Sequence, residues 1–244
     1  MHPLLEAIYK TNQFTNSSGE TVRIHSHTQK SQCEFIQSII RNNNFKDTLE
    51  IGFAYGISTL AIIEEVSKIN GRHCVIDKFQ ISGWGGNGLD LIRQAGYIDN
   101  LDFFEEYCYK VLPQLMFLNK KIDLAYIDST KQFDWLLLNF FYIDKLLKIG
   151  GIVVFDDVDW PGIRKLLRYI SRFPNYRLYG VYPENKRISL SKKLRLTIKF
   201  FPKVKNLLKS NVVKTDYELG INAHCVALQK IDEDKRNWDW HVDF

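Results

Sequence analysis

Residues 48–59 read Thr-Leu-Glu-Ile-Gly-Phe-Ala-Tyr-Gly-Ile-Ser-Thr, and this stretch predicts a buried strand, a glycine turn and the start of a helix. Gly52 permits a tight turn, Gly56 permits close approach of another group, and Ser58 or Thr59 can cap the helix. A turn of this kind presents backbone N–H groups to an anionic group. We therefore expect a ligand site directly after this strand.

Short apolar runs and stretches of helical length alternate along the rest of the chain. Further strands are predicted at 74–77, 101–104, 122–128 and 151–156, and helices at about 56–69, 88–95, 107–118, 131–148 and 160–172. This alternation predicts an α/β fold with a doubly wound, mostly parallel sheet. Gly150, after Lys148, is expected to cap the end of the long helix. In such sheets ligands bind at the carboxyl ends of the strands.

Length and composition predict one globular domain. The chain has 244 residues, of which 45% are hydrophobic and 25% are charged. We expect a single domain over 1–244 with an N-terminal helical segment at about 1–45, and an aromatic C-terminal stretch, 238–244, that packs on the body. Because no apolar run of about 18 residues and no basic leader is present, a cytoplasmic location is expected. The four cysteines form no C-x-x-C pair, which argues against a disulfide framework or a zinc site.

Basic residues gather in one segment. Ten Lys and Arg residues and no acidic residue lie between Lys186 and Lys214, so without them the formal net charge of +5 becomes −5. Apolar residues at helical spacing within this stretch predict a basic helical insertion at about 183–216. It is either a lid helix with its charged face in water or a peripheral attachment to an anionic membrane surface. No nucleic-acid partner is expected, because interleaved stacking aromatics are absent.

The glycine turn also constrains the ligand. A dinucleotide would need G-x-G-x-x-G, and Ala54 stands at the second glycine position. A nucleoside that carries a carboxylate in place of a pyrophosphate fits better, with Glu50 facing a ligand amine and Asp77 on the ribose hydroxyls. The alternative is a turn used only for packing. Trp84, on the glycine-rich stretch 82–88, either covers the nucleoside or anchors its own loop.

Carboxylates follow two further strands. Asp128 ends one predicted strand, and Asp156 and Asp157 end the next. Because adjacent parallel strands end at one edge, these oxygens are expected to meet and to suit Mg²⁺. Strand-end hydrogen bonding to loop N–H groups is the alternative.

These motifs together resemble the class I S-adenosylmethionine-dependent methyltransferases, in particular bacterial O-methyltransferases. The resemblance covers about residues 25–230 and rests on 49–56, 75–77, 122–128 and 147–157. It implies S-adenosylmethionine as cofactor and places its adenine near 106–108. The expected cofactor-binding residues are Glu50, Gly52, Gly56, Ser58, Asp77, Trp84, Glu106, Tyr107, Cys108 and Asp128.

The acids also resemble the metal-dependent catechol O-methyltransferase group. That pattern implies metal binding by Asp128, Asp156 and Asp157, the last where the group usually has Asn, and a base at Lys131. The implied reaction is methyl transfer to an oxygen of a small hydroxylated acceptor, a sugar or another metabolite, with Lys131 and Asp128 as catalytic residues. Lysine has an ordinary pKa of about 10.4, so a nearby dication must lower it.

Two other functions remain open from the sequence. A metal-dependent nucleotide-sugar glycosyltransferase could use Asp157-Val158-Asp159, and a non-catalytic nucleoside-binding protein could use the same turn. No histidine is assigned a role. His25 and His27, before the first amphipathic helix, either border the active site or lie in an exposed loop, and neither His224 nor His241 has a metal-ligand spacing.

Overall fold

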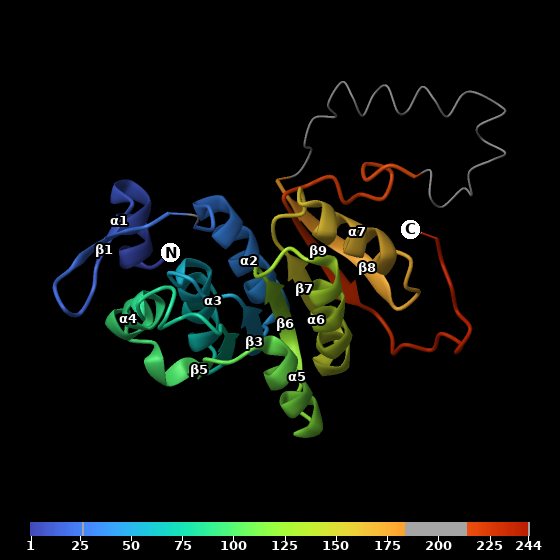
Figure 1. Cartoon of the computed structure of the whole chain (residues 1–244), viewed down its shortest axis with the longest axis horizontal. Helices are drawn as coiled ribbons and strands as arrows, with labels where there is room; N and C mark the ends of the chain where they lie inside the picture. The colour runs from blue at the N-terminus through green and yellow to red at the C-terminus, as the bar shows by residue number, and fades with distance from the viewer. Residues whose placement is uncertain (26, 184–213, 244) are drawn as a thin grey trace.

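A seven-stranded sheet forms the centre of the computed structural model, which describes residues 1–25, 27–183 and 214–243 (Figure 1). The strands are β1 (Gln13–Thr15), β2 (Thr21–Arg23), β3 (Asp47–Ile51), β4 (Arg72–Ile76), β5 (Leu101–Phe104), β6 (Ile122–Ile127), β7 (Leu147–Phe155), β8 (Tyr176–Tyr182) and β9 (Cys225–Lys230). The helices are α1 (Pro3–Thr11), α2 (Lys30–Asn43), α3 (Ile57–Ser67), α4 (Asn87–Gln94), the 3-10 turn η1 (Ile98–Asn100), α5 (Cys108–Phe117), α6 (Phe133–Leu146) and α7 (Pro161–Ile170).

The strand order in the sheet is β5-β4-β3-β6-β7-β9-β8. β5 through β7 pair in parallel, whereas β9 is antiparallel to both β7 and β8. One hydrophobic cluster joins the sheet to α5, α6 and α7, and a second joins it to α1, α2, α3 and α4. The predicted doubly wound, mostly parallel sheet is confirmed. The chain reverses its direction of winding between β3 and β6, which is where such folds bind ligands.

Two local predictions are wrong. The N-terminal 45 residues are not wholly helical, because β1 and β2 form a small antiparallel hairpin between α1 and α2. Gly150 does not cap the long helix: α6 ends at Leu146, and Gly150, at φ +88°, lies inside β7. The pairing of β6 with β7 shifts register between Ile122 and Leu124, so the glycine accommodates a bulge.

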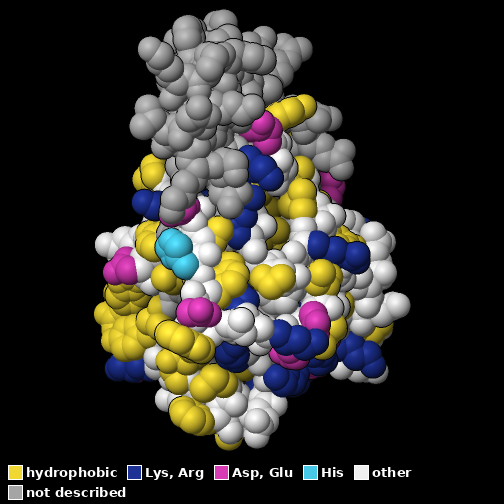
Figure 2. Space-filling view, turned by 90° about the vertical axis from the view of Figure 1, so that its right-hand side faces the viewer, with side chains coloured by type: hydrophobic (Ala, Val, Ile, Leu, Met, Phe, Trp, Pro, Cys, Tyr) yellow, Lys and Arg dark blue, Asp and Glu magenta, His cyan; other side chains and the backbone are white. Residues whose placement is uncertain are grey.

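The C-terminal stretch packs only in part. Trp240 contacts Tyr169, Phe173 and Arg236, whereas Trp238 is 98% exposed. On the face that carries this stretch, basic and acidic side chains are interspersed over the described atoms (Figure 2). Most of the predicted basic insertion, 184–213, lies outside the described residues, so its lid and membrane interpretations stay predictions. Among the described helices, none has the length and apolar character needed to cross a bilayer.

Candidate active site at the strand ends

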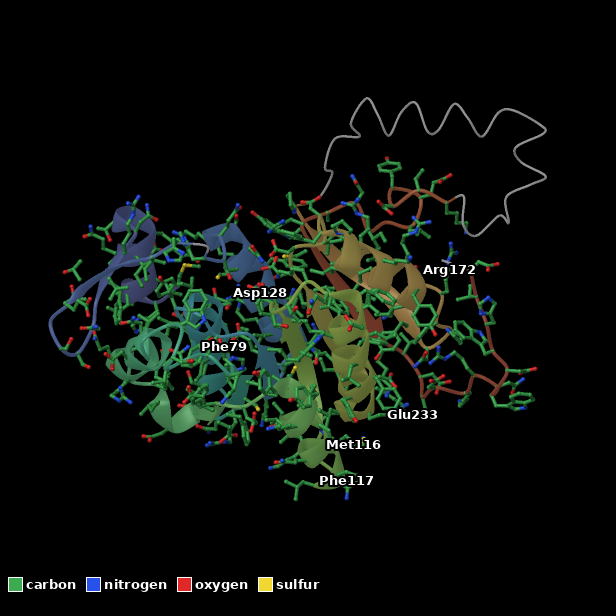
Figure 3. The ribbon with its side chains drawn as sticks, in the orientation of Figure 1. Phe79, Met116, Phe117, Asp128, Arg172 and Glu233 are labelled. Carbon is green, nitrogen blue, oxygen red and sulfur yellow. The ribbon has the colours of Figure 1, made fainter. Side chains whose placement is uncertain are left out.

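A pocket of about 520 Å³ opens at the carboxyl ends of the parallel strands, within the size range of small-molecule sites. Its walls come from the turn after β3, the ends of β4 and β6, the start of α5 and the segment before α2. In Figure 3, Asp128 lies between α2 and the central strands, and Phe79 lies toward α3 and α4. Of the predicted cofactor residues, the pocket is lined by Gly52, Ser58, Asp77, Trp84, Glu106, Tyr107, Cys108 and Asp128.

Gly52 is required because two strands meet at this point. Its φ is +100°, and a Cβ there would lie 2.0 Å from the backbone oxygen of Asp128. The backbone N–H of Asp128 in turn donates to the oxygen of Ile51 at 3.0 Å. Gly56, at φ +78°, would place a Cβ 3.0 Å from the ring of Phe53. Gly52 therefore lets the turn lie directly against the end of β6, and Gly56 lets it lie close to Gly88 in α4.

Asp77 is held on the pocket wall by backbone donors. Its Oδ2 accepts from the N–H groups of Phe53 at 2.9 Å and Ala54 at 3.1 Å, and its Oδ1 accepts from Phe79 N–H at 2.8 Å. Ala54 adopts a φ of +46°, which is uncommon for a residue with a Cβ. The turn after β3 and the Asp77 carboxylate thus hold each other in place, and Asp77 lines the pocket.

Glu50 lies behind the pocket, not in it. Its side chain has 0% exposure and accepts hydrogen bonds from Ser58 Oγ at 2.5 Å and Thr59 Oγ1 at 2.6 Å. The Nε2 of buried His73 lies 3.0 Å from Glu50 Oε2, the oxygen that also accepts from Thr59. The expectation that Glu50 faces a ligand amine is therefore wrong. Ser58 and Thr59 likewise do not cap α3, since Gly56 holds the N-cap position with no side-chain cap.

Aromatic rings form another part of the pocket wall. Tyr107 stacks on Tyr109 with centroids 5.3 Å apart and meets Phe79 edge-on at 6.2 Å. The Nζ of Lys78 lies 5.8 Å from the Tyr107 ring centroid. Trp135 of α6 completes the wall, and the sequence analysis did not single it out.

The start of α5 supplies polar contacts to the same wall. Glu106 Oε1 accepts from Tyr107 N–H at 2.8 Å, and Glu106 Oε2 pairs with Lys110 at 3.2 Å. Burial raises the pKa of the Cys108 thiol. The assignment of Glu106, Tyr107 and Cys108 to an adenine ring stays a prediction.

The segment before α2 closes the pocket. His27 and Thr28 line it, and burial lowers the pKa of His27. Nearby, His25 Nε2 lies 2.8 Å from Tyr55 Oη, and Trp84 meets Tyr55 edge-on. The sequence suggested that His25 and His27 could border a site but did not show their partners, because the contacts join segments about 30 and 60 residues apart.

Asp128 and Lys131 form an ion pair beside the pocket. Lys131 Nζ lies 2.8 Å from Asp128 Oδ1 and 2.8 Å from Asp157 Oδ2. Burial and the charge of Asp156 raise the pKa of Asp128 to about 7, against the effect of Lys131. Burial acts to lower the pKa of Lys131, but the two carboxylates outweigh it and the pKa is raised. The structure thus holds Lys131 as an ammonium between two acids, and its role as base stays a prediction.

Asp156 is buried, at 4% exposure, and held from several sides. Its Oδ2 accepts from Tyr126 Oη at 2.7 Å, and its Oδ1 accepts from Asp157 N–H at 2.7 Å and Cys225 Sγ at 3.1 Å. Neither Asp156 nor Asp157 lines the pocket, although Asp128 does. The predicted set of three acids is therefore split between the pocket and the region behind it.

His224 joins these acids and was assigned no role from the sequence. Across the described ranges 1–25, 27–183 and 214–243, one group of three potential ligands has atoms within 4.8 Å of one another: Asp156, Asp157 and His224. His224 precedes β9, whose Val226 pairs with Phe155 at the end of β7. An antiparallel strand that begins where its neighbour ends brings the histidine to the acids, and no local spacing signals this.

Comparisons with known proteins relate the chain to methyltransferases. Residues 49–158 match the family model of a methyltransferase domain. A caffeoyl-CoA O-methyltransferase of Eucalyptus globulus is 28% identical over 160 residues, which cover 60% of this chain and 62% of that protein. A tapetum-specific methyltransferase of Arabidopsis thaliana is 31% identical over 134 residues, covering 52% and 53%. The chain thus aligns with about three fifths or less of the length of these two relatives.

Solved structures share the fold. An O-methyltransferase from Bacillus cereus in complex with SAH superposes with a TM-score of 0.59 and 20% identity, over 73% of this chain and 83% of that one. Residues 49–158 are thus similar to a methyltransferase domain, and the chain shares the fold of these O-methyltransferases. The O-methyltransferase TomG from Streptomyces achromogenes, in complex with SAM, has a TM-score of 0.56 and 18% identity, with 62% and 73% covered. The residues that match the family model begin within β3 and end just beyond Asp157, so they include the glycine turn and the predicted acids.

Proposed function

We propose that the protein is an S-adenosylmethionine-dependent methyltransferase that methylates an oxygen of a small hydroxylated acceptor. One observation carries the proposal. The pocket lies at the switch point between β3 and β6, and it is walled by the glycine turn, Asp77 and a cluster of aromatic rings.

The residues present fit this cofactor. Gly52 lets the turn after β3 form part of the pocket wall without a side chain, and Asp77 offers carboxylate oxygens for hydroxyl groups. The buried Oγ of Ser129, in the pocket wall, has no hydrogen-bond partner among the described residues. A buried hydroxyl without a partner is costly unless a ligand satisfies it.

The chain supplies binding and orientation, while the cofactor would supply a methyl group already activated on a sulfonium. Asp77 and the turn would hold the nucleoside, and the rings of Phe79, Tyr107 and Trp135 would exclude water from it. Asp128 and Lys131 would border the acceptor hydroxyl.

Relatives suggest the class of acceptor. The curated relatives include caffeoyl-CoA O-methyltransferases, so we propose a hydroxylated small molecule, of which phenols and sugars are the classes to test. We also propose that a divalent cation assists, held by Asp156 and Asp157. A dication there would lower the pKa of Lys131, which the two carboxylates now raise.

Calorimetry tests the cofactor. Wild-type protein is titrated with S-adenosylmethionine, NAD and a nucleotide sugar, each with and without Mg²⁺. We expect S-adenosylmethionine to bind and NAD and the nucleotide sugar not to bind. Asp77→Ala should bind S-adenosylmethionine at least about tenfold more weakly, a loss of about 1.4 kcal/mol in binding free energy. Asp99→Ala is the matched control, because Asp99 is exposed on η1, outside the pocket.

Other outcomes reject the proposal. Binding of a nucleotide sugar with Mg²⁺ would favour the glycosyltransferase alternative. Binding of S-adenosylmethionine without methyl transfer to catechol, caffeoyl-CoA or any member of a sugar panel would favour a non-catalytic nucleoside-binding protein.

A further inference from the structure

The start of β9 places His224 among three carboxylates. Its Nε2 lies 3.4 Å from Asp156 Oδ1 and 3.6 Å from Asp157 Oδ1. Its Nδ1 lies 3.6 Å from Asp159 Oδ2. Backbone hydrogen bonds fix the residue on both sides, since its N–H donates to Tyr182 and its oxygen accepts from Val158 N–H at 2.8 Å.

These distances are long for hydrogen bonds and suitable for a shared cation. Hydrogen bonds of nitrogen to oxygen cluster near 2.9–3.0 Å. Ligands bound tetrahedrally at 2.0–2.2 Å lie about 3.3–3.6 Å from one another. The separations from His224 Nε2 to the two acids, 3.4 and 3.6 Å, fall in that range.

The remaining partners of these side chains orient them toward one another. Tyr126 holds Oδ2 of the Asp156 carboxylate, and Asp157 N–H and Cys225 Sγ hold its Oδ1. Lys131 contacts Asp157 through Oδ2, leaving Oδ1 toward the imidazole. Asp159 faces the far nitrogen of His224. A carboxylate behind a metal-bound imidazole is the usual outer-shell arrangement, because it fixes the ring and its tautomer.

Asp128 has a different partner. Its carboxylate is paired with Lys131 at 2.8 Å and is absent from the group of converging ligand atoms. In the predicted set of three acids, Asp128 is the third metal ligand. In the structure His224, and not Asp128, lies beside Asp156 and Asp157.

We propose that Asp156, Asp157 and His224 form a binding site for a divalent first-row transition-metal ion, such as Mn²⁺, Co²⁺ or Zn²⁺, in preference to Mg²⁺. Imidazole suits these ions, whereas Mg²⁺ is bound through oxygen ligands and water. Three protein ligands leave a position open for water or an acceptor oxygen. That role for the open position rests on the proposed methyl transfer, but binding of the ion does not.

Cobalt titration tests the site directly. Protein stripped with EDTA is titrated with Co²⁺ and followed by visible absorption, then competed with Zn²⁺ and with Mg²⁺. We expect about one Co²⁺ per chain, displaced by Zn²⁺ at far lower concentration than by Mg²⁺. His224→Ala should weaken Co²⁺ binding by at least the ~10–100-fold that loss of an outer-shell partner causes. His241→Ala is the matched control, since His241 is an exposed histidine near the C-terminus.

A second measurement needs no variant. Pulsed EPR of wild-type protein loaded with Mn²⁺ should show nitrogen modulation from a bound imidazole, and His241→Ala should retain it. Absence of that modulation, absence of a Co²⁺ band, or a His224→Ala protein that binds Co²⁺ as tightly as wild type would overturn the inference.

The two proposals fail separately. Calorimetry with S-adenosylmethionine on the same samples reports the proposed function alone. Cofactor binding without transition-metal binding rejects the metal site, and metal binding without cofactor binding rejects the methyltransferase proposal.

Discussion

The carboxyl ends of the strands fall into two regions that hold their acids differently. After β3 and β4, Glu50 is enclosed by side chains and Asp77 is held by three backbone N–H groups. After β6 and β7, Asp128 and Asp157 share the ammonium of Lys131, and His224 faces Asp156. The first region is locally satisfied and shapes a pocket. The second depends on charges from several strands, so its arrangement should respond more strongly to added cations.

Gly52→Ala should have the largest effect, because it disrupts the contact between the two regions. The new Cβ would overlap the oxygen of Asp128 at 2.0 Å, at a φ of +100°. We expect a loss of at least about 4 kcal/mol in the free energy of unfolding, or no folded protein. Urea denaturation measures this.

Gly96→Ala provides the control for that prediction. Gly96 has a similar φ of +80° but no atom within 4 Å of its virtual Cβ. It should lose only the ~1–2 kcal/mol that a left-handed residue costs. Equal losses in both variants would show that the contact with Asp128 is not what requires Gly52.

The sequence predicted the first region better than the second. The strand, turn and helix of 48–59 follow from local patterns, and strand β5 lies at the predicted residues, 101–104. Asp77 was found because it ends a strand next to the turn. Glu50 was misplaced because its partner His73 comes from β4, and a one-dimensional pattern does not show which side of a strand end is enclosed.

The second region could be predicted only in part. Asp128 and Asp156 follow parallel neighbours, so their proximity could be inferred from topology. His224 could not, because β9 returns antiparallel after a long segment and its register with β7 is fixed by tertiary packing. Gly150 was taken for a helix cap for a similar reason, since the pairing with β6 extends β7 back to Leu147.

Glu50→Gln, in the first region, should lower the stability of the fold without lowering the affinity for S-adenosylmethionine. The variant disturbs hydrogen bonds from Ser58 and Thr59 and the contact with His73 in a buried site. We expect a loss of about 2–3 kcal/mol in the free energy of unfolding, because hydrogen bonds to a charged group are involved. Affinity for S-adenosylmethionine, measured by calorimetry below the unfolding transition, should stay within a few-fold of wild type. A loss as large as that of Asp77→Ala would mean that Glu50 does act on the ligand.

Lys131→Met should act on turnover rather than on cofactor binding. It removes the ammonium that joins Asp128 and Asp157. Methyl transfer from labelled S-adenosylmethionine to catechol or caffeoyl-CoA should fall by ~100-fold or more, the range for loss of a proton-transfer group. Lys120→Met, at an exposed position after α5, is the control. Unchanged turnover in Lys131→Met would reject the predicted base.

Asp234→Asn should have the smallest effect. It shows how much an acid outside both regions contributes to the free energy of unfolding. Asp234 pairs with Arg236 through two contacts of 2.7 and 2.6 Å, and the guanidinium carbon lies 3.5 Å from the Phe173 ring centroid. Hydrogen bonding to Arg236 lowers the pKa of Asp234 to about 2, against the effect of burial. Because the folded-state pKa lies below the unfolded one, the stabilisation is complete above the unfolded pKa of about 4 and is lost as pH falls toward 2.

We expect Asp234→Asn to lower the free energy of unfolding by about 1–2 kcal/mol at pH 7, with the difference from wild type shrinking between about pH 4 and pH 2. Urea denaturation at several pH values measures it. Asp232→Asn is the comparison: Lys235 also lowers the pKa of Asp232, but this pair is exposed, so the variant should show a smaller change over the same pH range. A difference that is constant with pH would mean that packing of Arg236 between Phe173 and Trp240, rather than its charge, anchors the C-terminal stretch.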